Sequence, residues 1–253
     1  MTTSEPALEL VEVTKRFGGI VAVSGISTKV APGERRAIIG PNGAGKTTLF
    51  KLISGEVSLS HGHISLFGRD ISHVAAAERV RLGLGRTYQI TNVFLHLRVE
   101  QNVFLALQGL SRRKFNMFTR ESTADMRNKA HAVLDQLRMA HLAQQYVHEL
   151  GYGQQRQLEL ALAIASNPKV LLLDEPAAGL SSVERNVMAD LVRSLPRDLT
   201  IVLIEHDMDL ALKLVDSVSC LHNGELLAED VPDKIQHNAA IQEIYLGAMD
   251  LTR

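Results

Sequence analysis

Short segments in which apolar and polar residues alternate open the chain, and this pattern predicts β-strands. Residues 8–13 mix apolar with acidic side chains as a half-buried strand does, and residues 15–19 predict a glycine-containing turn. Residues 21–30 continue as strand-like sequence until Pro32-Gly33 interrupts them. The start of the chain therefore predicts an antiparallel sheet.

Continuous apolar segments come next, at residues 36–39, 170–174 and 200–204. An unbroken apolar run is typical of a central parallel strand that is buried on both faces. Residues 46–53 have the spacing of a helix, and Ser181 with Glu184 predicts a capping box for the helix that follows them. The other expected elements are strands at residues 62–67 and 83–89, helices at 75–81, 99–110 and 123–137, a helix opened by Gly151 and Gly153, and a hairpin around Asn223-Gly224. Together these elements predict an α/β fold.

No central strand is expected between residues 91 and 149, so this region predicts an α-helical subdomain inserted in an α/β core. We expect the whole chain, residues 1–253, to form a single domain. In this division residues 1–90 and 150–235 make the core with its antiparallel β subdomain, 91–149 make the helical subdomain, and 236–253 make a C-terminal tail. The end of the chain, from residue 233 to 253, is expected to be helical and then to fray.

The charge balance, 27 basic against 28 acidic side chains, gives no dominant field and does not indicate nucleic-acid binding. The single cysteine, Cys220, excludes an internal disulfide and fits a reducing compartment. No signal peptide is expected, and no apolar stretch approaches the length that spans a bilayer. Any role at a membrane would therefore depend on a partner.

A phosphate-binding loop stands between the strand at residues 36–39 and the helix that follows it. Its backbone N–H groups can surround a polyphosphate because glycines let the chain curl closely. Lys46 would reach the β- and γ-phosphates, and the Thr47 hydroxyl could ligate Mg²⁺. The loop consists of Gly40, Pro41, Asn42, Gly43, Ala44, Gly45, Lys46, Thr47 and Thr48.

Polar side chains follow three of the expected strands. Asp174 and Glu175 end the strand at 170–174, where α/β sheets place ligands, so Asp174 could hold Mg²⁺ through a water and Glu175 could accept a proton from an attacking water. His206 follows the strand at 200–204 and could donate to a γ-phosphate. Gln89, expected as the last residue of its strand, could ligate a metal or orient water, although a lone Gln is usually a surface residue.

Two further features are ambiguous when taken alone. Gly151, Tyr152, Gly153 and Gln154 begin a helix, which is either a second anion site or an ordinary glycine-rich N-terminus. Phe17, beside two glycines, could stack on an adenine ring or pack against the sheet.

In combination, these motifs closely resemble those of the ATP-binding cassette (ABC) family of transporter ATPases, over nearly the whole chain and in the family's order. The resemblance implies a P-loop NTPase (RecA-like) core that uses ATP and Mg²⁺. It assigns Phe17 to adenine stacking, residues 150–154 to the family signature, and Gln89 to metal contact and to sensing the membrane partner. It also implies Asp174 as the metal acid, Glu175 as the catalytic base and His206 as the switch histidine.

Four shorter segments, residues 86–89, 176–180, 204–208 and 245–247, look like those of ATPase subunits of branched-chain amino-acid importers, a branch that also imports urea and amides. Two residues depart from the family. Gly151 replaces the usual Ser, which removes a hydroxyl contact to the γ-phosphate, and Ser181 replaces the usual Asp or Asn.

The resemblance also implies partners. Two cassettes would enclose two ATP molecules head to tail, with the phosphate loop of one chain facing Gly151–Gln154 of the other. The partner cassette is expected to be a related ATPase, with a homodimer as the second choice. Membrane permease subunits would bind the helical subdomain, a periplasmic solute-binding protein would take part indirectly, and the chain would lie on the cytoplasmic face of the membrane.

Other classes fit less well. A soluble ABC ATPase of DNA repair would carry a long coiled coil, and a nucleotide kinase or GTPase would need neither the second glycine helix nor His206. An exporter ATPase for lipid or lipopolysaccharide stays open, and the sequence does not identify the solute.

Overall fold

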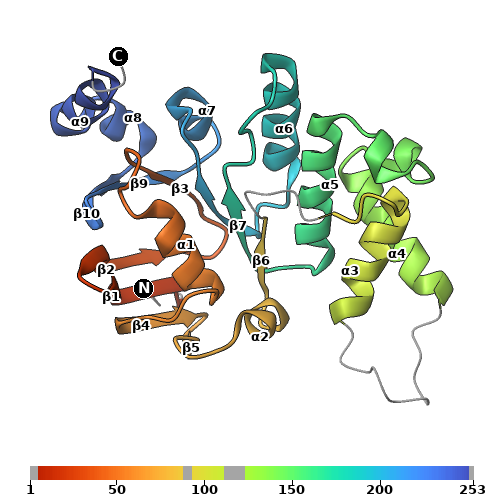
Figure 1. The fold of residues 1–253 in the computed structure, drawn as a ribbon, viewed down its shortest axis with the longest axis horizontal. Helices are drawn as coiled ribbons and strands as arrows, with labels where there is room; N and C mark the ends of the chain where they lie inside the picture. The colour runs from red at the N-terminus through yellow and green to blue at the C-terminus, as the bar shows by residue number, and fades with distance from the viewer. Residues whose placement is uncertain (1–4, 88–92, 111–122, 251–253) are drawn as a thin grey trace.

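A computed structural model describes residues 5–87, 93–110 and 123–250. Two β-sheets organise them (Figure 1). The central sheet has the strand order β10-β9-β3-β8-β7-β6, and the smaller sheet has the order β2-β1-β4-β5. The central strands are β3 (Arg35–Ile39), β6 (Leu84–Arg86), β7 (Val170–Asp174), β8 (Thr200–Ile204), β9 (Ser217–His222) and β10 (Glu225–Asp230); the others are β1 (Leu8–Phe17), β2 (Ile20–Val30), β4 (His61–Leu66) and β5 (Arg69–Asp70).

The central sheet is parallel from β9 to β6, and β10 adds an antiparallel edge. Parallel strands end at the same edge of a sheet, so the segments after β3, β7 and β8 meet there. The expected strands at 36–39, 170–174 and 200–204 are confirmed, as is the hairpin around Asn223-Gly224. This edge carries the phosphate loop and the acids.

Alternate residues of the central strands pack into two separate hydrophobic cores, one on each face of the sheet. In β7, Leu171 and Leu173 belong to the core shared with the helices α5 and α6. Val170 and Leu172 belong instead to the core shared with α1 and the smaller sheet. Because neighbouring residues of a strand point to opposite faces, a strand covered on both sides must be apolar throughout.

The antiparallel sheet expected at the start of the chain is confirmed, with two differences. β1 continues to Phe17, so the turn is confined to Gly18-Gly19 rather than beginning at Lys15. The sheet also includes β4 and β5, which come after the phosphate loop. β1 has two edges, and since β2 pairs with one, β4 can pair with the other.

The helices lie on both sides of the central sheet (Figure 1). α3 contacts α4 and α5 at one end of the molecule, while the smaller sheet lies at the other. Among the described residues between 91 and 149 no strand forms beyond an isolated bridge from Arg98 to Tyr146, as expected. The helices are α1 (Lys46–Ser54), α2 (Ala76–Arg81), α3 (Val99–Leu110), α4 (Thr123–Gln136), α5 (Tyr152–Ala165), α6 (Ser182–Ser194), α7 (Met208–Leu212), α8 (Pro232–Gln236) and α9 (Ala239–Asp250), with 3-10 turns at Ala140–Leu142 and Val147–Glu149.

Some element bounds differ from the expectations. β6 ends at Arg86, three residues before Gln89, which lies outside the described residues. The tail forms two helices instead of one, because Asn238 interrupts it and its side chain accepts hydrogen bonds from the backbone of Ala240 and Ile241. The short helix α7 was not expected; the Asp207 side chain caps its first turn.

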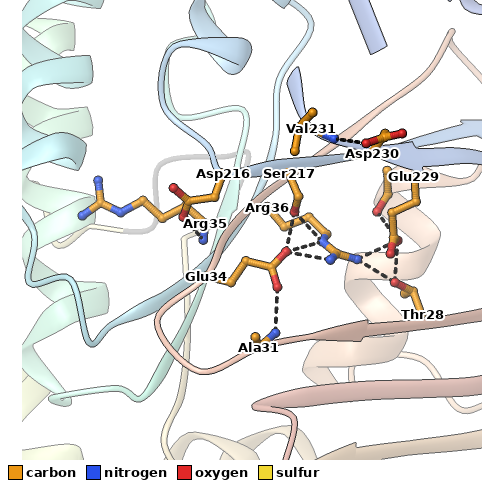
Figure 2. Close-up of polar contacts among 11 residues, drawn as sticks. Thr28, Ala31, Glu34, Arg35, Arg36, Asp216, Ser217, Glu229, Asp230 and Val231 are labelled. Atoms are coloured by element: carbon orange, nitrogen blue, oxygen red, sulfur yellow. Dashed lines mark hydrogen bonds and ion pairs between the residues drawn. The ribbon is translucent and has the colours of Figure 1, made fainter. Parts of the chain in front are cut away.

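A polar cluster around Arg36 joins the two sheets (Figure 2). The buried Arg36 guanidinium forms ion pairs of 2.6 Å with Glu34 and with Glu229 of β10. It also donates to the hydroxyl groups of Thr28, in β2, and Ser217, in β9. A buried guanidinium is stable only when such partners satisfy it, so the cluster fixes β2 against the central sheet.

Candidate functional site

The phosphate loop follows β3 and depends on glycine at two close approaches. A Cβ atom on Gly40 would lie 2.2 Å from the Leu221 carbonyl oxygen, and one on Gly45 would lie 2.5 Å from that of Ala22. Gly45 also has a φ of 97°, in the left-handed region that favours glycine. The backbone of β2 and of the β9–β10 hairpin therefore packs closely against the loop, and only glycine fits at these two positions.

Lys46 begins α1 and is almost fully buried. Its Nζ atom donates to the carbonyl oxygens of Gly40 at 2.7 Å and Pro41 at 3.0 Å. Burial lowers the pKa of Lys46, and the nearby Glu175 carboxylate opposes that shift. The ammonium thus lies beneath the loop, close enough to the acids to be stabilised as a cation.

A cleft of about 330 Å³ opens over the loop. Polar groups contribute most of its surface, and they come from α1, from the loop and from the segments after β7 and β8. Its lining residues are Ala22, Asn42, Gly43, Ala44, Gly45, Lys46, Thr47, Thr48, Glu175 and His206.

Asp174 ends β7 and is 1% exposed. Its Oδ2 atom accepts a hydrogen bond of 2.9 Å from Arg86, whereas its Oδ1 atom has no hydrogen-bond partner within the part of the chain that the structure describes. Burial raises the pKa of this carboxyl, and the Arg86 guanidinium opposes the rise. A buried carboxylate oxygen without a partner suits a hard cation such as Mg²⁺.

Glu175 and His206 meet at the mouth of the cleft. The Glu175 carboxylate and the His206 imidazole form a hydrogen bond of 2.6 Å between Oε1 and Nε2. Glu175 has a φ of 50°, which is uncommon for a residue with a side chain, and its N–H donates to the Ile204 carbonyl oxygen. This turn directs a carboxylate into the cleft that the phosphate loop lines.

The signature residues do not line this cleft. Gly151 is the N-cap of α5, and the Tyr152 ring lies against Gly179, with its hydroxyl donating to the Ala178 carbonyl oxygen at 3.4 Å. Gly153 and Gln154 instead line a separate hollow between α5 and α6. The second glycine-rich helix start therefore lies outside the cleft over the chain's own phosphate loop.

The remaining expected residue, Phe17, lies at the end of β1 and is 49% exposed, with the Lys15 ammonium 4.9 Å from its ring centre. It does not line the cleft over the phosphate loop. The half-exposed ring lies at the tip of the β1–β2 hairpin, beside the strand that carries Ala22.

Three residues at this edge were not identified from the sequence as parts of the site. Arg86 pairs with Asp174 and also with Glu56, at 2.5 Å. The Thr87 hydroxyl accepts from the Asp174 N–H at 3.2 Å, and the Glu205 carboxylate accepts from the Ala177 N–H at 3.1 Å. The available signal in the sequence was a charged residue at the end of a strand for Arg86, and directly after an apolar strand for Glu205.

Comparison with known proteins now identifies the family. The model of a family described as "ABC transporter" matches residues 23–178. This chain belongs to the ABC transporter family. It is an ATP-binding, ATP-hydrolysing subunit. The matched region includes the phosphate loop, Asp174 and Glu175.

The curated relatives of this ABC protein extend over nearly its full length. It is 35% identical to the high-affinity branched-chain amino acid transport ATP-binding protein BraF of Pseudomonas aeruginosa, covering 96% of this chain and 99% of BraF. Its identity to the LivG protein of the same description from Escherichia coli K12 is 32%, covering 96% of this chain and 99% of LivG.

A solved structure supports the fold. The ADP conformation of an ATP-binding cassette of an ABC transporter superposes with a TM-score of 0.85 and 29% identity, covering 96% of this chain and 99% of that one. Within residues 5–87, 93–110 and 123–250, no helix of this protein is long and apolar enough to cross a membrane.

Proposed function

We propose that this subunit powers the import of branched-chain amino acids or related small polar solutes. The support is the relationship to BraF and LivG, which covers nearly all of each protein and is not confined to the nucleotide-binding motifs. An exporter ATPase for lipid or lipopolysaccharide is the alternative, and co-purification with a permease and a solute-binding protein would favour import.

In the proposed hydrolysis, residues 40–48 bind the phosphates through backbone N–H groups and through Lys46. Glu175 accepts a proton from the attacking water, and His206 holds Glu175 in place and donates to the γ-phosphate. The hydrogen bond of 2.6 Å between these two side chains, at the mouth of the phosphate cleft, is the observation that carries this assignment. Phe17 stacks on the adenine ring.

Mg²⁺ fits the donor set. Thr47 and Asp174 would hold it together with Gln89, and the buried Oδ1 atom of Asp174 needs a partner that a cation would supply. Bound there, Mg²⁺ would neutralise charge on the β- and γ-phosphates.

Two cassettes are required in this proposal. Residues 151–154 lie outside the cleft that residues 42–48 line, which supports a site in which one chain supplies only part of the groups around an ATP. A second ATPase, related to this chain or identical to it, would bring its own α5 N-terminus to the cleft. The two kinds of dimer can be tested separately. A homodimer would form from this chain alone, whereas a heterodimer would also need the related ATPase.

The proposal also places the protein in a membrane complex. The helical subdomain, residues 91–149, would bind permease subunits on the cytoplasmic face of the membrane, and a periplasmic solute-binding protein would deliver the solute to them. Residues 1–253 form one ATPase domain in this view, with the core at 1–90 and 150–235 and a tail at 236–253.

The Glu175→Gln variant tests the assignment of the base. The amide keeps the shape and the contact with His206 but loses basicity, so turnover is expected to fall by about 10²–10⁴-fold. ATP binding is retained or strengthened, because a negative charge near the γ-phosphate is removed. Glu243→Gln, which removes the same charge from the exposed face of α9, is the matched control. Near-normal turnover of Glu175→Gln would exclude Glu175 as the base.

A further inference from the structure

Glu205 follows β8 directly and is one of the few acidic side chains in the described residues that are almost fully buried. It is 4% exposed, belongs to the segment that carries His206, and contacts the segment that carries Glu175. Burying a carboxyl group destabilises the folded state unless the group forms hydrogen bonds, so the hydrogen-bond partners of Glu205 indicate its role.

Those partners are backbone N–H groups in the two segments that carry Glu175 and His206. The Oε1 atom of Glu205 accepts from the Ala177 N–H at 3.1 Å, two residues after Glu175. The backbone N–H of His206 also interacts with this carboxyl. One side chain therefore links the turn after β7 to the segment after β8.

The turn that Glu205 holds has an unfavourable backbone conformation. Glu175 adopts a φ of 50°, and such residues persist only where their surroundings fix them. The Glu175 N–H is bound to the Ile204 carbonyl oxygen at 3.0 Å, and the Ala178 N–H is bound to the Glu175 carbonyl oxygen at 3.1 Å. Two side-chain contacts hold the turn beyond its first residue: the bond from the Ala177 N–H to Glu205, which is buried, and the longer bond of 3.4 Å from the Tyr152 hydroxyl to the Ala178 carbonyl oxygen.

We propose that Glu205 is a positioning residue for hydrolysis: its carboxyl oxygen fixes the Glu175 turn against the His206 segment and so aligns the two side chains. This inference rests on the proposed role of Glu175. Glu205 does not line the cleft, and its hydrogen bonds go to the backbone of Ala177 and His206, so it acts through Glu175 and His206. What the site requires of it is an acceptor atom at Ala177, which a glutamine amide also provides.

The experiment measures steady-state ATP hydrolysis of this chain assembled with its partner cassette, comparing the wild type with Glu205→Ala, Glu205→Asp and Glu205→Gln. Removing the oxygen with Ala lowers kcat by about 10- to 100-fold, since a displacement of the order of an ångström costs up to about 100-fold. The KM for ATP stays unchanged. Asp, which withdraws the oxygen while keeping the charge, gives an intermediate loss, and Gln gives the wild-type kcat.

Asp216→Ala is the matched control. The Asp216 carboxylate also accepts from a backbone N–H, that of Arg35 at 3.0 Å, but at the opposite edge of the central sheet (Figure 2). This variant loses a carboxylate–backbone bond without disturbing the Glu175 turn, so its kcat equals that of the wild type. Thermal unfolding of each variant confirms that the measured protein is folded.

A double-mutant cycle with Glu175→Gln separates positioning from a structural role. Glu205→Ala causes no further loss of kcat in the Glu175→Gln background if it acts through Glu175. An equal loss in both backgrounds, or a Gln variant as slow as the Ala variant, overturns the proposal for Glu205. Wild-type turnover in Glu175→Gln alone would instead overturn the proposed base, and the two failures are distinguishable.

Discussion

Replacing Glu205 with glutamine removes a titrating group from the interior and should change how folding stability depends on pH. Burial raises the pKa of Glu205 from its usual 4.5 to about 7, and the nearby carboxylates of Glu175 and Asp207 add to this rise. The backbone N–H groups of Ala177 and His206 oppose it. Each pKa unit corresponds to about 1.4 kcal/mol, so ionised Glu205 destabilises the folded protein by about 3 kcal/mol relative to the protonated form.

The sign follows from proton binding. Between pH 4.5 and about 7 the folded protein holds a proton on Glu205 that the unfolded chain has released, so raising the pH through this window favours unfolding. Below pH 4.5 both states are protonated, and above about 7 the loss is complete. Glutamine does not titrate, so the advantage of Glu205→Gln over the wild type grows through this window and is constant above it.

Urea unfolding of both proteins at pH 5, 6, 7 and 8 measures the effect. Other groups titrate alike in the two chains, so the difference between their free energies of unfolding isolates Glu205. That difference should increase by roughly 2–3 kcal/mol from pH 5 to pH 8 in favour of the variant. A difference that does not change with pH would refute a raised pKa at Glu205 and would mean that the carboxyl is ionised throughout.

Two other substitutions test the anion sites. Lys46→Ala removes the cation beneath the phosphate loop, so ATP hydrolysis should be abolished; turnover at the wild-type rate would contradict the role of the loop. Gly151→Ser should retain ATPase activity, because Gly151 has a φ of −63° and a Cβ atom there would meet nothing closer than 3.9 Å. Loss of activity in a folded Gly151→Ser protein would exclude the assigned alignment of the signature.

Local pattern was sufficient to predict the phosphate loop, the buried strands and the capping of α6. The apolar run at residues 170–174 predicts a strand covered on both faces, and the two cores confirm it. Ser181 and Glu184 predict a capping box, and their side chains form it. These features depend on residues close together in the sequence, so the local sequence is enough to predict them.

Contacts between distant segments were not predictable in the same way. β4 pairs with β1 across more than forty intervening residues, and nothing in either strand identifies its partner. The pairing of Arg86 with Asp174 is also invisible in the sequence, because it requires β6 and β7 to be neighbours in the central sheet. Glu205 was recognised only as part of a family-like segment, since its partner Ala177 lies on another strand's loop.

The ion pair between Asp174 and Arg86 affects how well the buried Asp174 carboxyl group could bind a metal ion. A carboxylate binds Mg²⁺ only when it is ionised, yet burial raises the pKa of Asp174 and favours its neutral form. Arg86 opposes that rise by bonding to Oδ2, and it leaves Oδ1 to another partner. The guanidinium therefore does not compete with the proposed metal for the same atom. By opposing protonation of Asp174, Arg86 favours the charged form that the proposed metal would need, so a cation beside this residue is compatible with the binding of another cation.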